Sequence, residues 1–334
     1  MAIALIDTDI KLGFHISKKK TLMDSFECMT CTPLRSYQIY LSNGRSYEPP
    51  KYDTVDLLET RKLLTRQERY SCIHGCLLYN LAGSVDHLDD PKYHVKLGNT
   101  RRGLLAELDI GAGYDAGVVV HIGSCKNKAT GIKTIASSIE HVLEKTTKDT
   151  KKIANALNMS ENDLAKKRKV ILENAAGEGN KIGSTLDEIS QIIKSVKPEL
   201  RSQVSVCLDT AHLFGAGQYN IGDAEHVVKL YEDFENKIGI EYLECFHLND
   251  SRAEFGSKKD RHENIGLGFI FNPDIDIEKK DGLYTFMQIA KMSSIPLIGE
   301  PPGKMSDGSP GLGGIWDYSF INSIFPLEQI DFTC

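Results

Sequence analysis

The sequence predicts an α/β protein built as a single (β/α)8 TIM barrel that spans residues 1–334. Eight short apolar runs, rich in β-branched and aromatic residues, alternate with longer stretches whose apolar residues recur every three or four positions. This alternation is typical of parallel βα units, and eight units in about 300 residues favour a closed barrel over an open sheet. Five of the runs carry a histidine or a carboxylate at or near their end, which predicts a site at the C-terminal ends of the strands.

The expected elements follow this alternation along the chain. Amphipathic helices are predicted between the strands, as in residues 131–148 and 186–197. Residues 145–169 are charged and poor in aromatics, which predicts a helical insertion on the outer face of the barrel; a basic arm that contacts nucleic acid is the alternative. The predicted strands are residues 11–17, 36–42, 70–74, 117–123, 169–174, 204–210, 242–250 and 295–300.

The composition, with 41% hydrophobic and 26% charged residues, is that of an ordinary globular protein. The sequence has neither the long apolar run of a transmembrane helix nor a signal peptide at its start, MAIALIDTDIK, so no membrane partner is expected. Eight irregularly spaced cysteines favour a reducing compartment, and the Cys28–Cys31 CxxC lacks the second pair of a four-cysteine zinc site. The net charge of −6 argues weakly against a polyanion partner, but three divalent cations would cancel it.

The strand ends are the first sign of chemistry. In a parallel barrel the C-terminal ends of all strands surround one mouth, so residues far apart in the sequence meet there. A single polar residue at a strand end is usually a turn former, but five histidines and carboxylates in equivalent positions indicate a site. These residues are His121, Glu173, Asp209, His247 and Glu300.

Four more residues extend the set to nine candidate ligands: His74, His212, Asp260 and His262. Imidazoles and carboxylates without thiolates suit a borderline ion such as zinc in an open catalytic site, and nine ligands are enough for three ions. A carboxylate can bridge two ions, and water bound to zinc is acidified enough to give hydroxide at neutral pH. The residues therefore predict metal-assisted hydrolysis of a phosphate ester.

Four segments carry a resemblance to a known family. They are KVILENAAGEG (169–179), SVCLDTAHLFGAG (205–217), HLNDSRAEFGSKKDRHENIGLG (247–268) and IPLIGEP (295–301). These segments resemble the signatures of the endonuclease IV family, the zinc-dependent apurinic/apyrimidinic (AP) endonucleases of DNA base excision repair. The resemblance runs from GFHIS near the start to about residue 325, and the long H-L-N-D…D-R-H motif is its most specific part.

The resemblance implies a trinuclear zinc site on a TIM barrel, with Glu173 and Glu300 as catalytic carboxylates. The first zinc would be held by His74 and His121, with Glu173 bridging to the second. The second would be completed by Asp209, His247 and Glu300. The third would be held by His212, Asp260 and His262. An early histidine, His15, matches a family residue that is not a ligand and is expected to pack or to form a hydrogen bond.

The implied reaction cuts the DNA backbone on the 5′ side of an abasic site and leaves a 3′-hydroxyl and a 5′-deoxyribose phosphate. Hydroxide held between the first two zinc ions would attack phosphorus, and the third ion would stabilise the departing 3′-oxygen. The family commonly also trims blocked 3′ ends, so a 3′-repair diesterase activity is expected. The expected partner is damaged double-stranded DNA, and the expected enzyme is an intracellular monomer, cytoplasmic or nuclear, or carried in the virion if its source is viral.

The resemblance also implies residues that contact DNA. Arg45 stands where the family has a residue that enters the damaged duplex, and Leu77 and Leu78 stand where it often has Tyr then Leu. A leucine can wedge between bases but cannot stack as a ring does, which leaves Tyr47 and Tyr79 as aromatic candidates for that role. Phosphate contacts are expected from Lys258, Lys259 and Arg261, with surface solubility as the alternative for the two lysines.

Two other functions are compatible with part of the pattern. Sugar isomerases and epimerases of the related xylose-isomerase-like barrels also end strands in Glu, Asp and His, but they need about four ligands and would leave the D-R-H loop unexplained. A damaged-DNA binder without turnover is the non-enzymatic alternative. The number of bound metal ions separates the first alternative from a nuclease, and a cleavage assay separates the second.

Overall fold

A computed structural model describes residues 10–27, 29, 32, 34–42, 44–83, 91–276, 279–304 and 311–327. Cys28 and Cys31, the two cysteines of the CxxC, lie outside these ranges. Five cysteines in the described part of the chain are free thiols. None of the helices in that part combines the length and the apolarity needed to cross a membrane.

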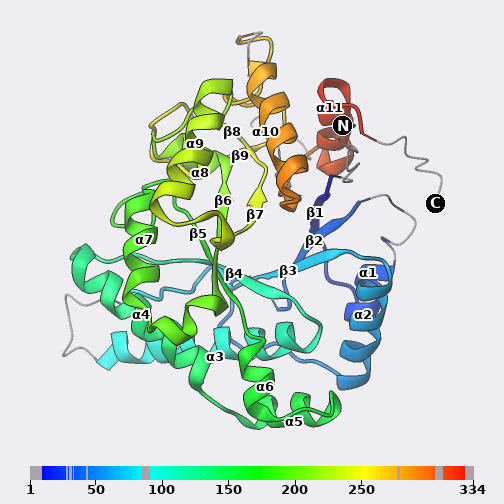
Figure 1. The fold of residues 1–334 in the computed structure, drawn as a ribbon, viewed down its shortest axis with the longest axis vertical. Coiled ribbons are helices and arrows are strands. Elements are labelled where there is room, and N and C mark those ends of the chain that lie inside the picture. Colours follow the sequence, from blue (N-terminus) through cyan, green and yellow to red (C-terminus); the bar gives the residue numbers. More distant parts are fainter. Residues whose placement is uncertain are drawn as a thin grey trace, which may run out of the picture.

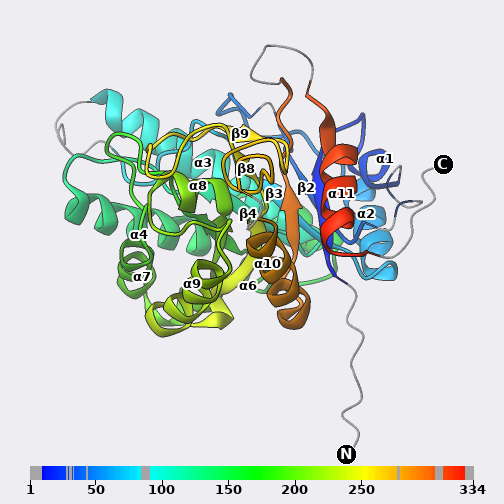
Figure 2. The same cartoon turned by 90° about the horizontal axis from the view of Figure 1, so that it is seen from above.

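Eight parallel strands close into the predicted barrel, and their order around it follows the order of the chain (Figures 1 and 2). Each predicted apolar run contains one strand, which confirms the fold class. The strands are β1 (Leu12–Ile16), β2 (Ser36–Ile39), β3 (Tyr70–His74), β4 (Gly117–His121), β5 (Val170–Glu173), β6 (Val204–Asp209), β7 (Leu243–His247) and β10 (Leu297–Gly299).

The predicted strand 242–250 is longer than the observed one. β7 ends at His247, and the Thr210 hydroxyl then donates to the carbonyl of Asn249 (2.7 Å) and accepts from its N–H (2.8 Å), which takes those groups out of the barrel ladder. The chain continues into β8 (Asp250–Ser251), which pairs antiparallel with β9 (His262–Glu263). This small sheet returns the chain to the barrel mouth.

Helices surround the barrel wall, and the two helices predicted above are α4 and α7. Both begin at side-chain caps: Asn127 accepts from the N–H of Thr130, and Thr185 accepts from that of Glu188. α8 differs from the helices on the outside of the barrel, because it is a short helix whose six residues are all buried and which directly follows β6. The helices are α1 (Leu22–Glu27), α2 (Thr54–Arg66), α3 (Pro91–Gly113), α4 (Lys128–Glu144), α7 (Leu186–Ser195), α8 (Thr210–Gly215), α9 (Ala224–Lys237), α10 (Lys279–Ser293) and α11 (Gly313–Ile324), with 3-10 turns at Pro198–Gln203 and Ile240–Tyr242.

The segment 145–169 contains α5 (Lys148–Ala156) and α6 (Glu161–Lys166), which pack against α3. Its basic end is not free to act as an arm. The Arg168 side chain is completely buried and its Nη2 lies 2.7 Å from Asp109 Oδ1, while Lys167 and Lys169 pair with carboxylates at 2.7 and 2.8 Å. Residues 166–169 directly precede β5, so they lie at the N-terminal end of the barrel, opposite the mouth. Residues 167–169 are therefore not available to a basic arm, and the role of the whole segment 145–169 stays a prediction.

A completely buried layer of side chains fills the barrel beneath its mouth: Cys72, Val119, Ile171, Cys207, Cys245 and Ile298. Each of these residues lies two positions before a candidate ligand. Side chains two apart on a strand point to the same side. In six strands the candidate ligand therefore points into the barrel, directly above this layer. In five of them it is the last residue of the strand, and in β10 it is the residue that follows.

Candidate metal centre

The nine candidate ligands gather at the mouth of the barrel. His74, His121, Glu173, Asp209 and His247 are the last residues of β3 to β7, and Glu300 directly follows β10. His212 lies on α8, whose first turn is set by Asp209, because the Asp209 carboxylate accepts from the N–H of His212 at 2.9 Å. Asp209 thus caps α8 and at the same time positions His212, a second candidate ligand.

Asp260 comes from the loop between β8 and β9, and His262 is the first residue of β9. Backbone hydrogen bonds hold this loop against α8, from Lys258 N to Gly215 O (2.8 Å) and from Gly256 N to Phe214 O (3.0 Å). The base of the loop is tied by the buried Asp250, whose carboxylate accepts backbone N–H groups of residues 251, 266, 268 and 270 at 2.8–3.2 Å. The loop can therefore reach back over the mouth.

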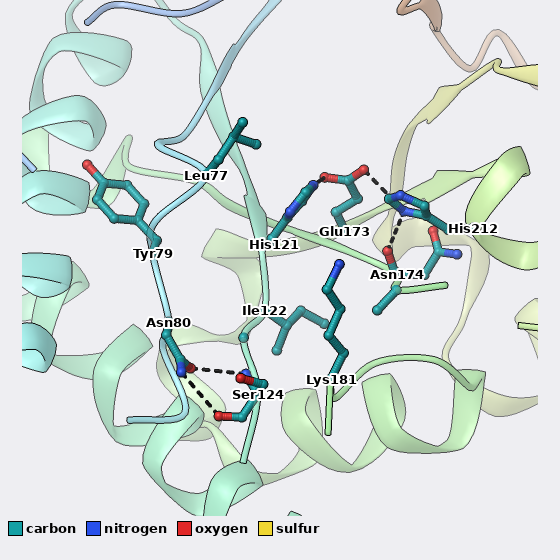
Figure 3. Close-up of a pocket in the computed structure, with 12 residues that line it drawn as sticks. Leu77, Tyr79, Asn80, His121, Ile122, Ser124, Glu173, Asn174, Lys181 and His212 are labelled. Atoms are coloured by element: carbon teal, nitrogen blue, oxygen red, sulfur yellow. Dashed lines mark hydrogen bonds and ion pairs between the residues drawn. The ribbon is translucent and has the colours of Figure 1, made fainter. Parts of the chain in front are cut away.

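The ligand atoms form three groups, within each of which all atoms lie within 4.8 Å of one another. Asp260 approaches the second of these groups, with Oδ2 3.2 Å from His212 Nε2 and Oδ1 3.5 Å from His262 Nε2. Glu173 belongs to two groups and lies between the histidines. In Figure 3, His121, Glu173 and His212 point toward one another at the edge of a cavity. The groups are His74, His121 and Glu173; Asp209, His212 and His262; and Glu173, Asp209, His247 and Glu300.

Atoms without a hydrogen-bond partner show that this donor set fits a metal ion. Among the described residues, Glu173 Oε2, His212 Nε2 and His262 Nε2 are buried and make no hydrogen bond. Each of these atoms still lies 3.1–3.6 Å from an imidazole nitrogen or a carboxylate oxygen of another candidate ligand. The groups are therefore close together, but their geometry is not that of hydrogen bonds. Leaving such atoms unpaired is costly, and an ion bound by imidazole and carboxylate would satisfy them.

The electrostatics of the mouth favour added positive charge. Burial opposes protonation of His247, but Glu300 and Glu173 raise its pKa to about 10. Burial also acts to raise the pKa of Glu300, yet His247, His74 and His262 lower it to about 2. Glu300 is thus ionised at neutral pH and, with Glu173, draws a proton onto His247. A divalent cation would supply the same charge and leave the imidazoles neutral, which is the form that binds metal.

Backbone carbonyls and side-chain amides orient the candidate ligands. His74 Nδ1 donates to Gly75 O (2.8 Å) and His212 Nδ1 to Asn174 O (2.9 Å), which leaves Nε2 of each ring for the ligand groups. Asn249 Nδ2 donates to Asp209 Oδ2 at 2.7 Å and to Glu300 at 3.1 Å. Sequence reasoning missed these amides, although Asn174 directly follows Glu173 and Asn249 lies two residues after His247 in the quoted motifs.

The residues predicted to enter DNA lie on two loops that are joined beside the mouth. Leu77 N donates to Gly44 O (2.8 Å), next to Arg45, and Tyr47 Oη donates to Leu78 O (2.7 Å). Arg45 is exposed, and so are Leu77 (40%) and Leu78 (42%). Leu77 lines the same cavity of about 200 Å³ as His121, Glu173 and His212. An apolar side chain is thus available beside the candidate metal centre.

Tyr79 cannot replace the family tyrosine that Leu77 lacks. Tyr79 also lines the cavity, but its side chain is buried, and in Figure 3 the ring points away from His121 and Glu173. Its hydroxyl lies against α3, where a Cβ at Gly103 would come within 2.4 Å of it. The predicted phosphate contacts Lys258, Lys259 and Arg261 are exposed on the loop that carries Asp260. Lys181, which sequence reasoning missed, also lines the cavity, with Nζ 3.7 Å from Asp260 Oδ2.

Comparison with known proteins identifies the family. A family model described as a xylose isomerase-like TIM barrel matches residues 37–278, so the chain belongs to that family of barrels. Apurinic-apyrimidinic endonuclease 1 of Saccharomyces cerevisiae is 28% identical over 305 residues, which are 89% of this chain and 73% of that protein. Probable endonuclease 4 of Thermosipho melanesiensis is 31% identical over 278 residues, 80% of this chain and 83% of that protein.

A solved structure shares the fold. Endonuclease IV from Thermus thermophilus superposes with a TM-score of 0.66 at 22% identity, covering 94% of this chain and 98% of its own. Within the xylose isomerase-like barrels, the chain belongs to the endonuclease IV family of hydrolytic nucleases. The family resemblance inferred from the sequence motifs is confirmed.

Proposed function

We propose that this protein is a DNA repair endonuclease that hydrolyses the phosphodiester bond on the 5′ side of AP sites, leaving a 3′-hydroxyl and a 5′-deoxyribose phosphate. The observation that carries the proposal is the gathering of nine histidines and carboxylates in three adjoining groups at one barrel mouth. A sugar isomerase would need about four such ligands, so no sugar chemistry is proposed. Relatives named apurinic-apyrimidinic endonuclease support the choice of substrate.

Three zinc ions would be held by these residues. His74 and His121 would bind the first, with Glu173 shared between the first and the second. Asp209, His247 and Glu300 would complete the second, and His212, Asp260 and His262 the third. Bound there, zinc would acidify water and offset the charge that develops on a reacting phosphate.

The remaining side chains of the mouth bind and orient. Glu173 and Glu300 are the proposed catalytic carboxylates, and Asn249 holds Glu300 through a hydrogen bond of 3.1 Å. Lys181 borders the same cavity, where its ammonium group can bind a phosphate oxygen of the substrate. The backbone and amide contacts described above fix the rings before substrate arrives, so little reorganisation is needed during the reaction.

DNA would be held by the loops around the mouth. Arg45, Leu77 and Leu78 would enter the duplex at the lesion, since apolar side chains can unstack neighbouring bases. Lys258, Lys259 and Arg261 would contact backbone phosphates. The proposed substrates are duplexes with abasic sites or blocked 3′ ends, so the enzyme would also act as a 3′-repair diesterase. It would act as a monomer in the cytoplasm or the nucleus, where reduced thiols such as those of its described cysteines are normal.

Incision of a defined duplex tests the proposal. A duplex with one tetrahydrofuran abasic analogue should be cut on the 5′ side, and a polymerase should extend the new 3′ end without further processing. Elemental analysis of the purified protein should give three zinc ions per chain. An uncut strand at a large excess of zinc-loaded enzyme would exclude the assignment, and one or two ions per chain would favour sugar chemistry instead.

A further inference from the structure

β2 contributes none of the nine candidate ligands, yet it places a completely buried amide, Gln38, beside them. Its Nε2 donates to Glu300 Oε1 at 2.7 Å and faces His15 Nδ1 at 3.2 Å. Its Oε1 lies 2.9 Å from His247 Nε2 and accepts from Cys72 Sγ at 3.4 Å. Both protons and both acceptor positions of the amide are therefore engaged.

The carboxylate of Glu300 determines the orientation of the Gln38 amide, that is, the positions of its oxygen and its nitrogen. An ionised carboxylate can only accept hydrogen bonds, so the NH2 group must face Glu300 and the carbonyl must face His247. With an ion bound, His247 Nε2 would carry the proton and the lone pair of Nδ1 would be available to the ion; without one, Nδ1 is placed to donate to Glu173 Oε1. Nδ1 lies 3.1 Å from Glu173 Oε1 and 3.3 Å from Glu300 Oε2.

We propose that Gln38 is a positioning residue of the metal centre. Its carbonyl sets the tautomer of His247 and its NH2 group holds one oxygen of Glu300, so that both residues present their free atoms to the same ion. The inference rests on the proposed function, because that ion would be the one bound by Glu173, Asp209, His247 and Glu300. Outer contacts of this kind are a general means of orienting metal ligands.

The neighbouring strands keep the amide in place. β2 pairs with β1 and with β3, and Gln38 is directly opposite His15 in one pair and Cys72 in the other. Paired residues on parallel strands point to the same side, so a histidine and a thiol flank the amide at its own height in the barrel. The Cys72 thiol belongs to the apolar layer, which makes Gln38 the link between that layer and the candidate metal centre.

Zinc affinity tests the role of Gln38. Gln38→Met keeps the size of the side chain and removes all of its hydrogen bonds. We expect one of the three zinc ions to be released about 10–100-fold more readily to a chromophoric chelator, with the other two held as in the wild type. Gln203→Met is the matched control, because the Gln203 amide is also engaged by hydrogen bonds, here to two backbone carbonyls at 2.7 and 3.0 Å, but at the opposite end of the barrel. It should release zinc like the wild type.

A measurement on the wild-type protein covers the case in which Gln38→Met does not fold. Nitrogen-15 NMR of the zinc-loaded enzyme should show His247 protonated at Nε2 and not at Nδ1, with the resonance assigned by its loss in His247→Asn. Protonation at Nδ1, or unchanged zinc release by Gln38→Met, would overturn the inference and leave the proposed function intact. A wild-type protein that binds no zinc would overturn both.

Discussion

The barrel buries charged side chains at both of its ends, but the two clusters are built differently. At the N-terminal end, every N–H of Arg168 has a partner: Nε and Nη2 donate to Asp109 Oδ1 and Thr150, and Nη1 donates to the carbonyls of residues 142, 143 and 145. At the mouth, buried atoms of Glu173, His212 and His262 have no hydrogen-bond partner among the described residues. Both the cluster that stabilises the fold and the candidate metal centre therefore contain buried charge. The candidate metal centre differs because some of its buried atoms have no hydrogen-bond partner.

Removing Arg168 should give the largest effect on folding. Arg168→Met would leave the buried Asp109 carboxylate without its cation, and the free energy of unfolding should fall by about 3–5 kcal/mol. Urea unfolding of the zinc-free protein measures this. Burial already raises the pKa of Asp109. Without the guanidinium the folded-state pKa rises further above the unfolded value, so the loss of stability should grow as pH rises and shrink toward about pH 4.

The control for this comparison is the double variant Arg168→Met with Asp109→Leu, which leaves no unpaired charge and should recover much of the lost stability. A single variant as stable as the wild type would mean that the cluster does not hold the segment 145–169 against the barrel.

Changing the mouth should affect turnover rather than folding. Glu300→Gln replaces an anionic oxygen by an amide, and kcat on an abasic duplex should fall about 10²–10³-fold or more, with DNA binding retained. Glu244→Gln is the control, since Glu244 pairs with Lys169 at 2.8 Å at the other end of the barrel and should leave turnover unchanged. Wild-type kcat in Glu300→Gln would remove Glu300 from the catalytic set.

The smallest effect is expected at the rim. Arg45→Ala should weaken binding of a damaged duplex several-fold and reduce the slope of log K against log salt by about 1, because one positive charge that enters the duplex is lost. Arg66→Ala, at the end of α2 shortly before β3 and therefore at the N-terminal end of the barrel, should change neither quantity. Equal affinities of Arg45→Ala and the wild type at every salt concentration would show that the duplex is not entered at this loop.

Five strand ends could be predicted because each combines two local signals: an apolar run and a His or carboxylate that closes it. His247 is an example, although the run that contains it seemed to continue to residue 250. The bonds from Thr210 that end the strand come from another part of the chain and leave no local pattern. The buried position of Tyr79 has the same origin, since the room for its hydroxyl is the missing side chain of Gly103 on α3.

Gln38 could not be predicted from its own strand. SYQIYLS has the alternation of any half-buried strand, and a polar residue there reads as outward-facing. Only the closure of the barrel, which brings β2 within reach of β7 and β10, gives the amide its partners. Arg168 was misread for a related reason: it belongs to a charged segment predicted to lie on the outer face of the barrel, and its burial depends on Asp109 in α3.

The apolar layer beneath the mouth constrains how such a chain can change over time. Gaining or losing a single residue within one of six strands would exchange a ligand for a neighbour on the opposite face and destroy the centre in one step. Lengthening a connection on the outside carries no such penalty. Descendants of this protein should therefore differ in the size of their loops while keeping the spacing inside each strand, and new substrate preferences would arise at the rim.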